Sequence, residues 1–222
     1  MQFAPLYPFL YRILKPIFPH CLWSGNQDLP QIALTFDDGP HPKYTPQLLK
    51  VLERYHVPAS FFCLGVCVEK YPEVVREFDH QGHWIGLHGW EHRSFPFLST
   101  KELKDSLEET QEAINKACQL APEKVVDVRP PNGLFTPQTL QLLQQWHYRP
   151  VMWSVVPEDW THPGVNKVKE RIMQQVSNGS LIVLHDGNFG GKDVAKVTHL
   201  LIQELLQQGY EFVTVNQLWK HK

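Results

Sequence analysis

The chain has 222 residues, of which 42% are hydrophobic and 20% are charged, and its formal net charge is −2. This length and composition are typical of a soluble globular protein with one large core, or at most two small ones. The small net charge gives no indication of a nucleic-acid partner, and no apolar stretch is long enough to span a membrane.

Residues 1–30 form an apolar, proline-rich arm, and residues 31–222 are expected to form the catalytic domain. Residues 1–19 lack the basic start, unbroken apolar centre and small-residue cleavage site of a signal peptide. We expect the arm to pack across the domain, with peripheral contact to a membrane surface, or contact with a partner, as the alternatives. A cytoplasmic or membrane-peripheral location is favoured, and the cell envelope is the alternative.

Short apolar runs alternate with helical patterns along the rest of the chain, which is typical of a parallel sheet with helical crossovers. The helix at 99–118 is the clearest, because Ser99 and Glu102 form a capping-box pattern at its start. The predicted strands are 31–37, 59–65, 83–88, 125–130, 150–156, 180–185 and 211–215. The predicted helices are 44–55, 67–80, 99–118, 137–146, 164–176 and 194–208.

Seven strand–helix units are too few for a complete eight-fold barrel, which usually takes ~250 residues. The predicted fold is therefore α/β, a distorted and incomplete (β/α) barrel with about seven parallel strands. An open, doubly wound sheet is the alternative. We expect the four cysteines to be free thiols, because two of them, Cys63 and Cys67, lie in or beside an apolar run and no disulfide framework is evident.

Polar side chains that could take part in catalysis or metal binding follow the ends of the predicted strands. In both alternative folds, function lies at the carboxyl ends of parallel strands, so these side chains are expected to gather at one rim. They are Asp37 and Asp38, His88 and His92, Arg129 with Asn132, Glu158 with Asp159 and Trp160, and His185 with Asp186.

His88 and His92 are four residues apart, so both imidazoles can face one point. Two histidines and one carboxylate are a common ligand set for a catalytic metal with open positions, and Asp38 is the natural third ligand. The predicted cofactor is a divalent metal, with Zn²⁺ first and Co²⁺ or another transition metal as alternatives.

Two rival interpretations use the same residues. The string HGWEH at 88–92 fits the H-x-x-E-H pattern of inverted zinc proteases. That pattern requires a helix, and the two glycines, Gly86 and Gly89, disfavour one. The end of the first strand also suggests phosphoryl transfer through an aspartyl nucleophile, but such enzymes use Asp-x-Asp spacing and have little use for a histidine pair.

Five motifs in order resemble those of NodB-type polysaccharide deacetylases of carbohydrate esterase family 4. They are TFDDGP at 35–40, the histidine pair at 88 and 92, RPPNG at 129–133, DW at 159–160 and LH at 184–185. The resemblance covers residues 31–215 and implies a distorted (β/α) barrel that deacetylates amino-sugar glycans.

The resemblance also implies a role for each residue. Asp37 would be the general base and Arg129 would orient it, while Asp38, His88 and His92 would hold the metal. His185 would be the general acid, oriented by Asp159. The metal would polarise the acetyl carbonyl, and the backbone N–H of Asn132 would stabilise the oxyanion. Trp160, Pro131, Gly133 and Asn132 would contact substrate.

Two positions depart from the family pattern. Gly89 stands where the family usually has a serine or threonine whose hydroxyl braces the metal loop, and Asn132 replaces a tyrosine.

The expected reaction is removal of N-acetyl groups from a chitin- or peptidoglycan-like glycan or oligosaccharide. The alternatives are a carbohydrate O-acetyl esterase with the same site and a non-catalytic metal- or glycan-binding module. An aromatic groove for the sugar is expected from Trp90, Asn132, Phe135, Trp160 and Phe189, and His41 and Asp186 are expected to be loop residues near it.

Overall fold

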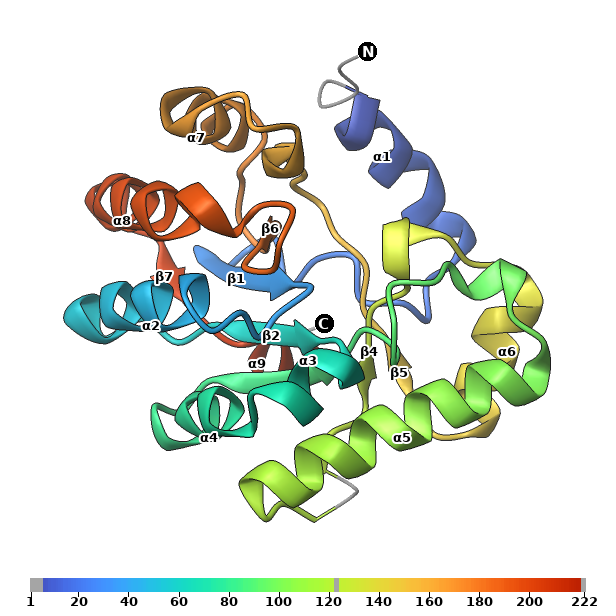
Figure 1. Cartoon of the computed structure of the whole chain (residues 1–222). Coiled ribbons are helices and arrows are strands. Elements are labelled where there is room, and N and C mark those ends of the chain that lie inside the picture. Colours follow the sequence, from blue (N-terminus) through green and yellow to red (C-terminus); the bar gives the residue numbers. More distant parts are fainter. Residues whose placement is uncertain (1–5, 122–123, 221–222) are drawn as a thin grey trace.

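The computed structural model describes residues 6–121 and 124–220, so the first five residues of the predicted arm lie outside the described residues. Helices surround a central sheet (Figure 1). The strands are β1 (Gln31–Asp37), β2 (Ser60–Cys63), β3 (Trp84–Leu87), β4 (Asp127–Val128), β5 (Arg149–Pro150), β6 (Leu181–His185) and β7 (Glu211–Phe212). The α-helices are α1 (Tyr7–Ile17), α2 (Tyr44–Tyr55), α3 (Gly65–Lys70), α4 (Pro72–His80), α5 (Thr100–Cys118), α6 (Pro137–Gln145), α7 (Val165–Met173), α8 (Gly191–Gln207) and α9 (Val215–Lys220).

Within the described residues, seven strands form one parallel sheet in the order β5-β4-β3-β2-β1-β6, with β7 paired to the start of β1. The sheet is not closed, which confirms the predicted distorted and incomplete barrel. Only isolated bridges span the side between β5 and β6. The arm residue Leu22 pairs with Val151, and Val155 pairs with Ile182.

Strand register explains why the polar residues meet at one rim. Asp37 pairs with His185 across β1 and β6, and Leu87 pairs with Val128 across β3 and β4. His88 and Arg129 are the next residues after that second pair, so they leave the sheet side by side. Because all these strands are parallel, their carboxyl ends face the same side of the sheet.

The large hydrophobic core lies between the strands and the outer helices. Phe36 of β1 stacks on Phe61 of β2, which stacks on Phe78 of α4, with ring centroids 5.2 and 4.0 Å apart. The capping box predicted at Ser99 is present, because its side chain accepts from the backbone N–H of Glu102 and the Glu102 carboxylate accepts from the N–H of Ser99.

Several predicted elements differ from those observed. The helix expected at 67–80 is two helices, α3 and α4, because Pro72 begins a new helix after Tyr71. The strands expected at 125–130, 150–156 and 211–215 are two residues long as β4, β5 and β7. The helix α9 was not predicted, and it begins at Val215, where a strand was expected to end.

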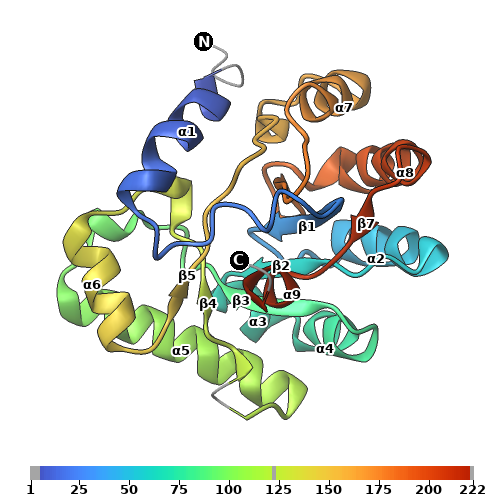
Figure 2. The same cartoon turned by 180° about the vertical axis from the view of Figure 1, so that it is seen from behind.

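The arm is partly helical and packs against the domain. In both views α1 lies beside the opening of the sheet, between α7 and α6 in the ring of helices (Figures 1 and 2). After α1 the chain turns inward, so that Cys21, Leu22 and Trp23 are almost completely buried. Among the described residues none of the four cysteines forms a disulfide, as expected. Within the described ranges, no helix combines the length and the apolar character needed to cross a bilayer.

Candidate active site

Three side chains at the rim form a group that fits a metal ion. Asp38, directly after β1, places its Oδ1 atom 3.4 Å from Nε2 of both His88 and His92. The three potential ligand atoms lie within 4.8 Å of one another. Asp38 Oδ1 is buried and lacks a hydrogen-bond partner among the described residues. A buried carboxylate oxygen without a donor is costly, and a cation at this point would compensate it.

His88 is held in the state that a metal requires. His88 Nδ1 donates to the carbonyl of Arg129 at 2.7 Å, which fixes the tautomer and leaves Nε2 directed toward Asp38. Burial lowers the pKa of His88, so the ring is neutral at pH 7, as metal binding demands. His92 is more exposed, and the two rings are 5.2 Å apart.

The loop between the histidines takes its brace from another helix. Gly89 has φ +86°, a left-handed conformation in which a serine or threonine would be strained. The next residue, Trp90, donates its backbone N–H to the Ser106 hydroxyl of α5 at 2.7 Å. A hydroxyl from α5 therefore holds the loop that carries the two histidines.

Asp37 is a buried carboxylate paired with a buried cation. Arg129 Nη1 donates to Asp37 Oδ1 at 2.7 Å and to Thr35 Oγ1 at 2.7 Å, while Nη2 donates to the carbonyl of Met152 at 2.9 Å. The guanidinium also lies over the Phe62 ring. Burial raises the pKa of Asp37, but the nearby cationic charge, chiefly that of Arg129, lowers it by more, so this carboxylate is ionised at neutral pH.

His185 forms a second buried pair with Asp159. Its Nδ1 donates to Asp159 Oδ1 at 2.8 Å, and its backbone N–H donates to Asp159 Oδ2 at 2.8 Å. Burial lowers the pKa of His185, but the charge and hydrogen bond of Asp159, together with the charges of Asp38 and Asp37, outweigh it and raise the pKa to about 9. The Trp160 ring stands edge-on to the imidazole at 5.1 Å. The free Nε2 atom is thus a proton donor at neutral pH.

Asp186 was expected to be a loop residue near substrate, but it is completely buried. It accepts a hydrogen bond from Thr45 Oγ1, and its backbone N–H donates to the carbonyl of Asp37. Burial, with Asp38 and Asp37 nearby, raises the pKa of Asp186 to about 7. A Cβ on Gly39 would collide with this carboxylate, so Asp186 packs directly behind the turn that carries the two rim aspartates.

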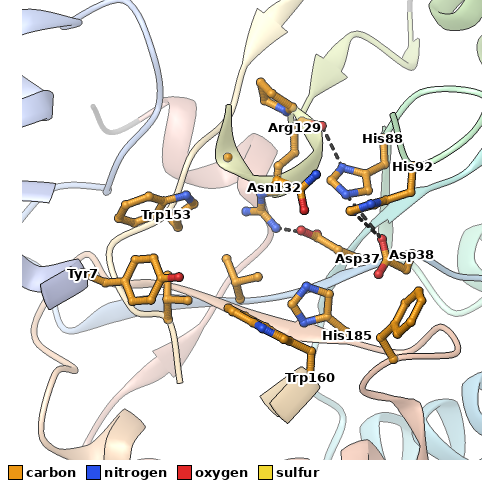
Figure 3. A pocket seen from close by; sticks show the side chains of 15 residues that line it. Tyr7, Asp37, Asp38, His88, His92, Arg129, Asn132, Trp153, Trp160 and His185 are labelled. Atoms are coloured by element: carbon orange, nitrogen blue, oxygen red, sulfur yellow. Dashed lines mark hydrogen bonds and ion pairs between the residues drawn. The ribbon is translucent and has the colours of Figure 1, made fainter. Parts of the chain in front are cut away.

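These groups open into one pocket of about 490 Å³. Figure 3 shows Asp37, Asp38, His88 and His92 near one end, with His185 facing them. Tyr7 and Trp153 lie toward the other end, with ring centroids 5.4 Å apart at 90°. The full lining is Tyr7, Asp37, Asp38, His88, His92, Arg129, Pro130, Asn132, Gly133, Trp153, Val156, Trp160, Val183, His185 and Phe189.

Most predicted site residues line this pocket, and the remainder have other positions. Asp159 lies behind His185, and Pro131 is buried in the short η4 turn (Pro131–Gly133) while Pro130 lines the pocket. Asn132 has φ 58° and donates its side-chain amide to Ser94 Oγ at 2.8 Å.

Two of the residues expected in the sugar groove lie elsewhere. Trp90 lines separate surface pockets against α5, and Phe135 packs edge-to-face on Phe18 of the arm. Two pocket residues, Tyr7 and Trp153, were not predicted to line it. Tyr7 belongs to the arm and Trp153 to a segment interpreted as a plain strand, so no local pattern pointed to the pocket.

An incomplete (β/α) barrel whose rim carries a His-His-Asp group between an ionised carboxylate and a cationic histidine is suited to hydrolysis assisted by a divalent metal. This defines the class of protein. A family described as polysaccharide deacetylase matches residues 24–151. The chain belongs to this family, the hydrolases of carbohydrate esterase family 4, as the five sequence motifs predicted.

Individual relatives agree with this assignment. The chain is 32% identical over 202 residues to a peptidoglycan-N-acetylglucosamine deacetylase of Bacillus cereus, covering 90% of this chain and 93% of that one. It is 35% identical over 158 residues to a chitooligosaccharide deacetylase of Sinorhizobium fredii, covering 71% and 73%.

A solved structure is similar over almost the whole chain. The crystal structure of a peptidoglycan N-acetylglucosamine deacetylase in complex with 4-naphthalen-1-yl-N-oxidanyl-benzamide superposes with a TM-score of 0.86 at 26% identity. The match covers 91% of this chain and 94% of that one. The distorted barrel is therefore the fold of this family.

Proposed function

We propose that this protein is a metal-dependent deacetylase that hydrolyses the N-acetyl group of an amino-sugar glycan or oligosaccharide. The observation that carries the proposal is the placement of three units around one pocket: the Asp38–His88–His92 group, the Asp37–Arg129 pair, and His185 with Asp159 behind it. Peptidoglycan and chitooligosaccharides, on which the relatives act by name, support the choice of substrate class.

The ligand set Asp38, His88 and His92 fits Zn²⁺ or Co²⁺ by donor type and by the unpaired Asp38 oxygen. When bound, such a metal supplies Lewis-acid polarisation of an acetyl carbonyl and of a water. The protein contributes the open pocket beside this group and holds both imidazoles toward the same carboxylate oxygen.

Asp37 is the general base of the proposal. Its low pKa keeps it ionised, and the bond from Arg129 holds one oxygen in place so that the other can accept the proton of the attacking water. Arg129 is itself fixed by three acceptors on two segments, Thr35 and Asp37 of β1 and the carbonyl of Met152. This preorganisation removes the need for the carboxylate to reorient as the reaction proceeds.

His185 is the general acid of the proposal. With its pKa at about 9 it holds a proton at neutral pH, and it delivers that proton from Nε2 to the departing amine of the sugar. Asp159 accepts from Nδ1, which fixes the ring orientation and keeps Nε2 directed into the pocket. The backbone N–H of Asn132 is proposed to stabilise the oxyanion.

The aromatic end of the pocket is proposed to hold the sugar. Trp153 and Tyr7 present ring faces and edges on which a pyranose ring packs, and Trp160 adds a ring beside His185. Asn132 and Gly133 border the same space from η4. The sugar then extends from the catalytic groups toward the aromatic end of one cavity.

The test is acetate release from a panel of N-acetylglucosamine oligomers and peptidoglycan fragments, with Zn²⁺, with Co²⁺ and with chelator. Asp37→Asn is the inactive variant, and Asp79→Asn, an exposed aspartate of α4, is the matched control. Acetate that requires metal and disappears only with Asp37→Asn supports the proposal. Acetate from O-acetylated sugars alone selects the esterase alternative, and metal binding without any acetate selects the binding module.

The panel also bears on location. The named activities of the relatives make peptidoglycan fragments the first substrates to compare, and a preference for them agrees with a place in the cell envelope. A preference for short, free oligosaccharides removes that support.

A further inference from the structure

The arm helix α1 exposes a continuous apolar stripe. Over the described residues, five of the nine exposed large hydrophobic side chains belong to this one helix and its N-cap. They recur at intervals of three or four residues, which places them on one face. They are Leu6, Phe9, Leu10, Ile13 and Ile17, with exposed fractions of 51, 63, 42, 43 and 59%.

The opposite face of α1 anchors the helix firmly to the domain. Tyr7 packs on Trp153, and the Tyr11 ring contacts Trp23. The Tyr11 hydroxyl and the Lys15 ammonium both donate to Ser24 Oγ, at 3.0 and 2.8 Å. One face of α1 is therefore docked on the domain. The stripe on its other face has no packing partner among the described residues.

The charge of this segment differs from that of the chain. Residues 1–27 contain the basic residues Arg12 and Lys15 and no acidic residue, whereas the whole chain has a net charge of −2. Arg12 is exposed beside the stripe. Lys15 lies on the docked face, bonded to Ser24, so Arg12 supplies the cation beside the stripe. An amphipathic helix with exposed aromatic and aliphatic side chains and a neighbouring cation is a form that binds the headgroup region of anionic bilayers.

We propose that the stripe of α1 docks on an anionic lipid surface. A second copy of the chain is a weaker occupant, because five half-exposed side chains present on the order of 500 Å². A stable protein interface needs ~800 Å² from each partner. The stripe is also a single convex helix, which suits insertion among lipid headgroups better than pairing with a flat face.

Docking would also fix the distance between the pocket and the lipid surface. Tyr7 lies on the inner face of the same helix and lines the pocket, so the cavity is one helix diameter from the lipid surface. Resting on the proposed function, this placement favours glycans that are themselves held close to a membrane. Lipid binding itself does not depend on that function.

The test is co-sedimentation of the full chain with vesicles of phosphatidylcholine, with and without phosphatidylglycerol. The variant Phe9→Gln, Leu10→Gln, Ile13→Gln should lower the partition coefficient at least about tenfold. Arg12→Gln should lower it about fivefold on the anionic vesicles only. Control variants Phe97→Gln and Leu206→Gln, which remove exposed apolar side chains elsewhere, should bind as the unmodified chain does.

Thermal unfolding and the vesicle assay on Asp37→Asn separate this proposal from folding and from catalysis. Unchanged unfolding of the triple variant shows that it folds, and binding by Asp37→Asn shows that docking is independent of turnover. The proposal is overturned if the unmodified chain ignores anionic vesicles or if the triple variant binds equally. It is also overturned if light scattering shows a dimer that the triple variant abolishes, because a second copy then covers the stripe.

Discussion

The variant Asp159→Asn tests whether Asp159 raises the pKa of its neighbour His185. In the folded protein the pKa of His185 is about 9, against an ordinary value of 6.5. That difference corresponds to ~3.4 kcal/mol of preference for the charged ring. With Asp159 neutralised, burial is opposed only by the smaller contributions of Asp38 and Asp37, so the pKa should fall toward the ordinary value of 6.5. A fall to that value lowers the protonated fraction at pH 8 from about 0.9 to about 0.03, an activity loss of about 30-fold.

The assay is acetate release over pH 5.5–10, with kcat/KM plotted against pH and Asp79→Asn as control. We expect the alkaline limb of the kcat/KM profile to move from about pH 9 to about pH 7 or below, and we expect the loss of activity to be smaller at pH 6 than at pH 8. The same linkage affects stability. A raised pKa stabilises the fold fully below pH 6.5, and the contribution is lost as pH rises through about 9. An alkaline limb that stays in place while the rate falls uniformly would refute this reasoning.

Three further changes probe other parts of the site. Arg129→Met leaves Asp37 buried without its cation and should cost about 3–5 kcal/mol in urea unfolding; a loss under ~1 kcal/mol would contradict the pairing. Ser106→Ala removes the acceptor of the Trp90 N–H and should weaken Zn²⁺ affinity about 10–100-fold in chelator competition; unchanged affinity would remove Ser106 from the loop's support. Tyr7→Ala should raise KM for oligosaccharides and leave the pH profile unchanged; a shifted profile would show that Tyr7 acts on the chemistry.

Much of the rim could be predicted because it follows from local sequence. A strand that ends in Asp37 and Asp38 and a strand that ends before His88 need only parallel packing to bring their ends together. The register that places Asp37 opposite His185 makes that packing specific. The lengths of short strands such as β4 were overestimated, because an apolar pattern indicates burial and does not show which residues form hydrogen bonds to a neighbouring strand.

Other features depend on contacts between distant segments and have no local signal. Ser106 of α5 supports the loop between His88 and His92, although it lies 16 residues beyond its partner Trp90 in the sequence. Asp186 looks like a turn residue in sequence, and only the fold shows that it is enclosed behind Gly39. Tyr7 reaches the pocket because α1 lies beside the opening of the sheet, which no local pattern predicts.

The irregular side of the barrel has a consequence for specificity. Because residues 151–155 form only isolated bridges, the Met152 carbonyl is available to Arg129, and the Trp153 side chain reaches the pocket. The helix α1 lies beside this opening and adds Tyr7 to the same wall. The regular strands thus supply the catalytic groups, while the opening supplies the aromatic wall. Exchanging residues of this wall should change the ranking of glycan substrates without moving the pH dependence set by the rim.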